Sequence, residues 1–204
     1  MRDLVRKNAW FFIAAVTAAL VLRIVFILYF SSVVNDSFIY GDIAKNWLRH
    51  GLYGVTTPEG ITPTYIRLPG YPIFLALVWT VFGLEHYRAV LILQVFIDLG
   101  TCLLCASMAF RLLGERAAKV AFLLAALCPF FANYTAAALT ETLEIFFTAL
   151  ALDAVLRALS SGAVRSWIVC GAACGVAISL RPDGAILPFV IVLYVGWRII
   201  FPKY

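Results

Sequence analysis

The chain has 204 residues, of which 64% are hydrophobic and 13% are charged, and its formal net charge is +5. Soluble domains are about half apolar and about a quarter charged, so a soluble interior of this size cannot bury so much apolar sequence. The composition therefore predicts an integral membrane protein. The basic residues lie mostly at the ends of apolar segments, which indicates membrane orientation and argues against nucleic-acid binding.

Six apolar segments have the length and composition of membrane-spanning helices, which need about 20 predominantly apolar residues. The fifth is short, and we expect it to extend by a few residues on either side. Together the segments predict an all-α integral membrane fold, a bundle of about six transmembrane helices. The six segments are residues 10–31, 88–112, 117–133, 136–157, 167–180 and 184–201.

A further apolar segment, residues 71–83, has about 13 residues, which suits a surface-lying or re-entrant helix better than a span. If it does not cross, six spans place ten basic residues on one side, the excess typical of the cytoplasm. If it crossed, Arg111, Arg116 and Lys119 would change sides and the excess would disappear. Both termini are therefore predicted to be cytoplasmic. The ten residues are Arg2, Arg6, Lys7, Arg111, Arg116, Lys119, Arg157, Arg165, Arg198 and Lys203.

The longest predicted loop covers about residues 32–87 on the external side of an otherwise tight chain. Long loops in compact proteins are usually functional or disordered, and this one carries a helical pattern. Ile39, Ile43 and Trp47 recur on one face, which predicts an amphipathic helix lying on the membrane surface. Gly51 is expected to end this helix before a turn.

Asp36 lies where the first predicted span meets the external surface. One interpretation is that it caps the amphipathic helix, because Asp is a favoured N-cap residue. The other is that its carboxylate, held close to a lipid-borne substrate, acts as a general base or a metal ligand. The two interpretations are compatible.

Two arginines on the predicted external side have functional interpretations. Arg67 precedes Leu-Pro-Gly and fits either a lipid-headgroup anchor or a phosphate ligand that makes paired hydrogen bonds. Arg181 lies in an Arg-Pro-Asp-Gly turn, which explains its neighbours but not the arginine itself. An anionic partner would explain both, so we expect Arg67 and Arg181 to converge on one external cavity.

Some ionisable residues lie within predicted spans or near their start, where charges are costly. Glu141 and Glu144 open the fourth span, where they either complement the helix N-terminus or have a functional role; Glu141 is nearer the external cavity. Arg23 and Asp98 lie within the first two spans, and we expect a structural ion pair between them, with Gln94 as a further partner.

Several short motifs follow one another along the chain. They are Asp36-x-x-x-Tyr40, Ile43-Ala44 with Leu48, His50-Gly51-Leu52-Tyr53, Arg67-Leu68-Pro69-Gly70-Tyr71-Pro72, Gln94 with Asp98, Leu139-Thr140-Glu141-Thr142-Leu143, and Leu180-Arg181-Pro182. No single motif is specific. The ordered set, on this topology, resembles the N-terminal part of GT-C membrane glycosyltransferases, the broad group with protein O-mannosyltransferases and bacterial aminoarabinose transferases, over about residues 1–200.

The resemblance implies that a sugar carried on a polyprenyl phosphate is passed to an acceptor hydroxyl on the external face, usually with inversion. On that template Asp36 is the catalytic base, and Arg67 contacts the donor phosphate. Glu141 matches a second acid of some members, while Tyr40 and Arg181 are expected to contact substrate. A divalent metal ion is the one cofactor that the resemblance allows, with Asp36 and Glu141 as candidate ligands.

The chain is expected to form a single transmembrane module over residues 1–204, in a bacterial inner membrane, with the active site on the periplasmic side. GT-C enzymes commonly have more spans, so we expect a truncated C-terminus, a short relative without catalysis, or part of an assembly. Expected partners are a lipid-linked sugar donor, membrane lipids and a larger membrane complex. The alternative function is a non-catalytic membrane subunit of such a complex. A small transporter ranks last, because the sequence shows no internal repeat.

Overall fold

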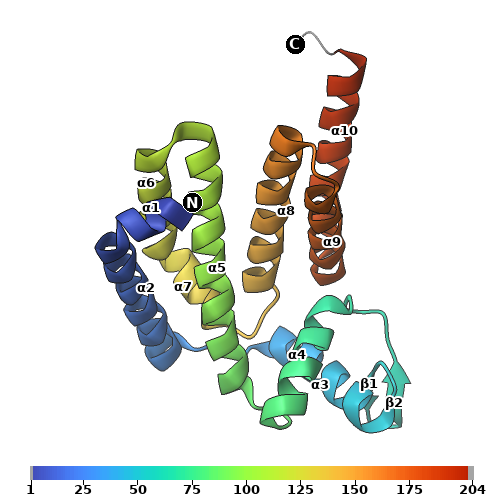
Figure 1. Ribbon diagram of the computed structural model, residues 1–204. Coiled ribbons are helices and arrows are strands. Elements are labelled where there is room, and N and C mark those ends of the chain that lie inside the picture. The colour runs from blue at the N-terminus through green and yellow to red at the C-terminus, as the bar shows by residue number, and fades with distance from the viewer. Residues whose placement is uncertain (1, 202–204) are drawn as a thin grey trace.

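The computed structural model describes residues 2–201. Its elements in chain order are α1 (Arg2–Lys7), α2 (Ala9–Phe30), α3 (Asn35–His50), β1 (Gly54–Thr57), β2 (Gly60–Pro63), α4 (Gly70–Phe82), α5 (Tyr87–Leu113), α6 (Glu115–Ala126), α7 (Pro129–Thr135), α8 (Glu141–Ser161), α9 (Val164–Leu180), the 3-10 helix η1 (Pro182–Ala185) and α10 (Ile186–Ile200). In Figure 1, one group of helices holds α2, α5, α6 and α7, and another holds α8, α9 and α10. Helices α3 and α4 lie with the hairpin β1–β2 at one end of both groups.

Three elements among residues 2–201 are long and apolar enough to cross a membrane: α2, α5 and the continuous segment Pro182–Ile200. Helices α6 and α7 pass the same test together as one broken span. Helix α8 has 21 residues but carries four charged ones, and α9 has only 17 residues. By length and composition, the described residues therefore contain three or four membrane-spanning helices. These agree with an all-α membrane protein, whereas the six-span bundle and its external loop stay predictions.

The predicted third span is not one straight helix. Helix α6 ends at Ala126 and α7 begins at Pro129, with a bend of 50° between them. A proline cannot donate a backbone hydrogen bond, so helix carbonyls before it are left without their usual partner. The Arg23 guanidinium acts as a donor to carbonyls at this break: it donates hydrogen bonds to the carbonyl oxygens of Ala126 (2.6 Å) and Ala125 (3.4 Å).

The predicted ion pair between Arg23 and Asp98 is confirmed. Both side chains are buried, and Arg23 Nε donates to Asp98 Oδ2 over 2.5 Å. The pair joins α2 to α5, and the contacts to α6 described above make Arg23 the common partner of three helices. Breaking a buried ion pair by removing one partner leaves an uncompensated charge, which typically costs 3–5 kcal/mol.

Gln94 does not join this pair, contrary to the prediction. It accepts a hydrogen bond from the Tyr71 hydroxyl (2.8 Å) and donates to the Ala137 carbonyl (2.8 Å) and to the carbonyls of the last two residues of α7. The segment after α7 is also held by the segment after α2, because the backbone N–H of Ser32 donates to the carbonyl of Ala136 over 2.9 Å. Gln94 therefore fixes the turn and bends that lead into α8, and with them the position of Glu141.

Helix α3 ends as predicted. Gly51 adopts a left-handed conformation (φ 68°), and its N–H donates to the Trp47 carbonyl. The polar face of α3 does not simply face water, because Asp42 accepts hydrogen bonds from the backbone N–H (2.6 Å) and the hydroxyl of Thr56. The buried Asn46 donates to the Gly54 carbonyl over 3.1 Å. These contacts hold a two-stranded antiparallel hairpin that the all-α prediction omitted.

Helix α4 has 13 residues, a length of roughly 20 Å, which is too short for the bilayer core. This length fits the predicted surface-lying or re-entrant helix. Tyr71, Leu75 and Trp79 form its buried face, in an apolar cluster shared with α3 and α5. At its start, a side chain on Gly70 would meet Ser179, so α4 begins directly against the end of α9. Figure 1 shows α4 beside α3, below α8 and α9.

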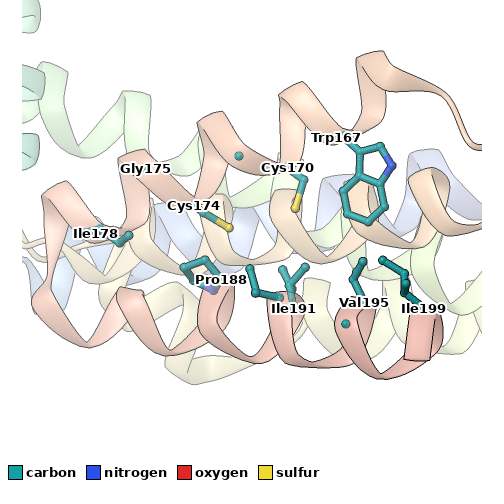
Figure 2. Close-up of a pocket in the computed structure, with 12 residues that line it drawn as sticks. Trp167, Cys170, Cys174, Gly175, Ile178, Pro188, Ile191, Val195 and Ile199 are labelled. Carbon is teal, nitrogen blue, oxygen red and sulfur yellow. The ribbon is translucent and has the colours of Figure 1, made fainter. Parts of the chain in front are cut away.

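Helices α9 and α10 run in opposite directions and leave an apolar groove of about 580 Å³ between them. Figure 2 shows Trp167 and Cys170 of α9 facing Ile191 and Val195 of α10 across this groove. None of the described residues of α10 is buried. In a membrane such a surface contacts lipid tails or another apolar helix, which have the same polarity.

Candidate functional site

A polar cavity of about 470 Å³ lies where α3, the segment after β2, the start of α8 and the α9–η1 turn meet. All five residues predicted for the site line it, although they come from four separate parts of the chain. The predicted convergence of Arg67 and Arg181 on one cavity is confirmed. The lining residues are Asp36, Tyr40, Tyr65, Ile66, Arg67, Leu68, Leu139, Thr140, Glu141, Leu180, Arg181 and Pro182.

Asp36 pairs with Arg67 and does not cap α3. Val34 occupies the N-cap position, and its backbone N–H is bound by the Ser37 hydroxyl over 3.2 Å. The Asp36 carboxylate instead accepts a hydrogen bond from Arg67 Nη2 over 2.7 Å. The Asp36 side chain is 54% exposed, and ion pairs this accessible contribute about 0–1 kcal/mol. An anionic ligand that offers Arg67 a better partner can therefore open the pair.

Arg67 is held in place while some of its donors stay available. Its backbone carbonyl accepts a hydrogen bond from the Tyr53 hydroxyl (2.9 Å), and its Nη1 donates to the Ile66 carbonyl (3.1 Å). The guanidinium also lies over the Tyr40 ring, 5.6 Å from the centroid. Its Nε is buried and has no hydrogen-bond partner among the described residues. A guanidinium has five N–H donors, so Arg67 can bind a phosphate with a pair of them.

Tyr40 forms a buried wall of the cavity beneath this guanidinium. Its ring packs edge-on against Tyr71, with 5.1 Å between the centroids. Burial raises the pKa of Tyr40, and the charge of Arg67, which lowers it, only partly offsets that effect. The Tyr40 hydroxyl is therefore protonated at neutral pH and can donate a hydrogen bond to a substrate oxygen.

Arg181 is surrounded by carboxylates. Its guanidinium lies 3.4 Å from Glu141, 3.3 Å from Glu144 and 3.3 Å from Asp183. The prediction assumed that Arg67 and Arg181 are unpaired and need an anionic ligand. That assumption was wrong, because carboxylates of the protein already pair with both arginines. Asp183 was missed as a site residue because the turn motif alone explained its presence. The group around Arg181 carries an excess of negative charge, which does not favour a phosphate there.

The acids of the site do not form a metal centre by themselves. No group of three His, Cys, Asp or Glu side chains that could hold a metal ion occurs in the part of the chain that the structure describes. The two predicted ligands, Asp36 and Glu141, each lie against an arginine. Magnesium is usually held by one or two carboxylates together with substrate phosphates. The divalent metal ion therefore stays a prediction, and we derive no step through a metal.

A second, apolar cavity adjoins the polar one. It has a volume of about 490 Å³ and lies among α5, α7 and α8. Glu141 lines both cavities, so both lie against the first turn of α8. One oxygen of Glu141, Oε2, is buried without a partner among the described residues. The apolar cavity is lined by Thr101, Cys105, Met108, Phe131, Tyr134, Glu141, Glu144, Ile145, Thr148, Ala149 and Leu152.

The family model described as dolichyl-phosphate-mannose-protein mannosyltransferase matches residues 63–201 of the chain. The matched region contains Arg67, Glu141 and Arg181, whereas Asp36 and Tyr40 precede it. No curated protein and no solved structure gives a significant match.

Proposed function

Since the chain belongs to the dolichyl-phosphate-mannose-protein mannosyltransferase family, we propose that it transfers a sugar from a polyprenyl-phosphate donor to an acceptor hydroxyl. The family supports a membrane glycosyltransferase that uses a lipid-linked sugar donor. We further propose that the acceptor group is a hydroxyl and that transfer occurs on the external face of the membrane.

The observation that carries the proposal is that Glu141 lines both the polar and the apolar cavity. A polyprenyl-phosphate sugar has a charged, hydrophilic head and a long apolar tail. The polar cavity with Arg67 suits the head, and the apolar cavity between α5 and α8 suits the first isoprene units of the tail. An amphiphile can therefore lie across both cavities without exposing its tail to water or its phosphate to lipid.

In the proposed reaction, the donor phosphate takes over the Arg67 Nη2 donor that now binds Asp36. The Asp36 carboxylate is then free to accept the proton of the acceptor hydroxyl. The acceptor oxygen forms a bond to the anomeric carbon as the bond from that carbon to the phosphate oxygen breaks, which inverts the configuration. The electron pair of the broken bond leaves on the polyprenyl phosphate, whose charge Arg67 stabilises.

Arg181 has a positioning role in this proposal. Its ion pairs with Glu141 and Glu144 fix the first turn of α8 at the boundary between the two cavities. Glu141 then presents an acceptor for the hydroxyl groups of the sugar. This division of roles gives the phosphate to Arg67, where the surroundings contain one carboxylate rather than three.

We propose that α8 and α9 also cross the membrane, which restores six spans. Glu141 and Glu144 lie in the first turn of α8 and Arg157 lies near its last turn, whereas Asp153 lies close to the middle. Asp153 is buried and paired with Arg157, which lowers the cost of its charge in the bilayer. The count of basic residues then puts both termini in the cytoplasm and the polar cavity on the external face of a bacterial inner membrane. Of the residues behind that count, Lys203 and the Arg2 side chain lie outside what the structure describes.

The rival function is a non-catalytic membrane subunit in a larger complex. The observation in its favour is α10, which buries no described residue and whose apolar face can pack against another protein. Such a subunit would retain the fold and the family resemblance without transferring sugar.

The deciding experiment is a transfer assay with the full protein reconstituted in vesicles and a panel of polyprenyl-phosphate sugars. We expect release of polyprenyl phosphate with at least one donor when a hydroxyl acceptor is present. We also expect Arg67→Ala to abolish it and Arg49→Ala, an exposed arginine on α3, to leave it unchanged. Release that is insensitive to Arg67→Ala would contradict the assignment of the phosphate site.

A further inference from the structure

A second polar cavity, of about 380 Å³, lies along the C-terminal half of α8, against the first turns of α9. It is separate from the candidate site, because Asp153 follows Glu141 by about 12 residues, or roughly 18 Å along the helix axis. Nothing in the proposed reaction uses this cavity. Its lining residues are Leu150, Asp153, Ala154, Arg157, Arg165, Ser166 and Val169.

The only acidic residue that lines this cavity is Asp153, and it is fully engaged with the protein. Its Oδ1 accepts hydrogen bonds from Ser107 (2.8 Å) and Arg111 (3.4 Å), and its Oδ2 pairs with Arg157 over 2.5 Å. Asp153 is buried, whereas the side chain of Arg157 is 48% exposed and keeps further N–H donors. The carboxylate therefore orients Arg157 without using up its hydrogen-bonding capacity.

Arg165 adds a second cation on the α9 side of the same cavity. It is exposed and makes no ion pair within residues 2–201, in contrast to Arg111 and Arg157. Ser166, next to it, is only partly exposed and has a side-chain hydroxyl with no partner in the described chain. Arg111 and Arg157 share the one carboxylate of Asp153, and Arg165 has none, so the C-terminal part of α8 and the start of α9 carry a local excess of positive charge.

From these contacts we propose that the cavity binds the phosphate of an anionic phospholipid headgroup. Arg165 and Arg157 donate charge-assisted hydrogen bonds to the phosphate oxygens, and the Ser166 hydroxyl donates a further one. Leu150, Ala154 and Val169 form an apolar wall on which the glycerol and the first acyl carbons lie. Basic cavities between membrane helices on the cytoplasmic side are suited to such headgroups. The proposal rests on the proposed topology and not on sugar transfer.

The test measures lipid retention, which does not depend on enzyme activity. The full protein is extracted from vesicles of phosphatidylcholine and phosphatidylglycerol, and native mass spectrometry records which lipid stays bound. We expect one phosphatidylglycerol to be retained in preference to phosphatidylcholine. Arg165→Gln should weaken this retention about tenfold, the loss expected for one charge-assisted contact. Arg165 has no partner in the fold, so this variant should keep its thermal stability.

Arg116→Gln is the matched control, because Arg116 is an exposed arginine of α6 on the same predicted side and lines none of the cavities described above. It should retain phosphatidylglycerol as the wild type does. Equal retention by wild type and Arg165→Gln, or equal loss in Arg116→Gln, would overturn the site. If inorganic phosphate alone displaces the lipid and binds as tightly, the ligand is free phosphate and the lipid assignment is wrong.

Discussion

Asp36 and Arg67 are 31 positions apart in the chain, yet their side chains meet over 2.7 Å in the lining of the polar cavity. The pair joins the first turn of α3 to the segment between β2 and α4. Because it is accessible, it costs little to open, and opening it produces the two groups that the proposed reaction needs: a free carboxylate and an unoccupied guanidinium. The pair is thus a resting state of the site rather than a purely structural link.

Arg67→Lys should weaken donor binding while the protein keeps its fold. Lysine retains the charge but cannot form the paired hydrogen bonds of a guanidinium with a phosphate. We expect KM for the polyprenyl-phosphate donor to rise roughly tenfold to a hundredfold, the value of about 1.5–3 kcal/mol for a charge-assisted hydrogen bond. Donor titration in vesicles measures this. A KM unchanged from that of Arg49→Lys would remove Arg67 from the phosphate site.

The pair of Arg23 and Asp98 should dominate the stability of the α2–α5–α6 group. Arg23→Met or Asp98→Leu alone leaves a buried charge unpaired and should cost about 3–5 kcal/mol, seen as a lower Tm in detergent. The double variant should recover part of this loss. It should not recover all of it, because the carbonyl groups of Ala125 and Ala126 lose their donor. Single variants that melt like the wild type would show that the pair carries no stability.

Gly70 should tolerate no side chain. A Cβ there would lie 2.6 Å from Ser179 Oγ and 2.7 Å from the Ser179 carbonyl oxygen, and the backbone of α9 cannot yield as a flexible side chain would. Gly70→Ala should therefore lower the Tm and disturb the nearby cavity. Gly171→Ala is the matched control, because nothing lies within 4 Å of its Cβ position. The two variants should be compared by thermal melting and by donor KM, and equal effects would argue against a tight α4–α9 contact.

The orientation in the membrane can be tested with a membrane-impermeant thiol reagent on a background without the native cysteines. Glu59→Cys, in the exposed turn of the hairpin, should be labelled from the periplasmic side. Arg116→Cys, exposed on α6, should be labelled only after the membrane is opened. Labelling of both from one side would be incompatible with the six-span topology.

The sequence predicted features that depend on local patterns or on strong physical costs. Gly51 ends α3 because a left-handed residue there favours glycine, and Arg23 pairs with Asp98 because neither charge is affordable alone in a bilayer. The five cavity residues were predicted from the order of short motifs along the chain and from charged residues, such as Arg181, that the local turn or helix does not require. Both kinds of information can be read from a single sequence.

Other features depend on distant contacts that no local pattern encodes. The pairing of Asp36 with Arg67 follows from how α3 meets the segment before α4, and Asp36 itself looked like an N-cap residue. The hairpin β1–β2 has short strands without clear alternation, and Asp42 and Asn46 of α3 hold it. A proline in the sequence coincides with the break between α6 and α7. The hydrogen-bond donor for the carbonyl of Ala126 at this break comes from Arg23 of another helix, which the sequence does not indicate.

The central claim, that Asp36 is the base of a glycosyl transfer, is tested most directly by Asp36→Asn in the full protein. Asparagine has the same shape and can still accept a hydrogen bond from Arg67, so the fold and the Tm should barely change. It cannot take up the acceptor proton, so kcat for sugar transfer from a polyprenyl-phosphate donor should fall about 100-fold or more. An Asp36→Asn protein that retains most of the wild-type kcat would contradict the account.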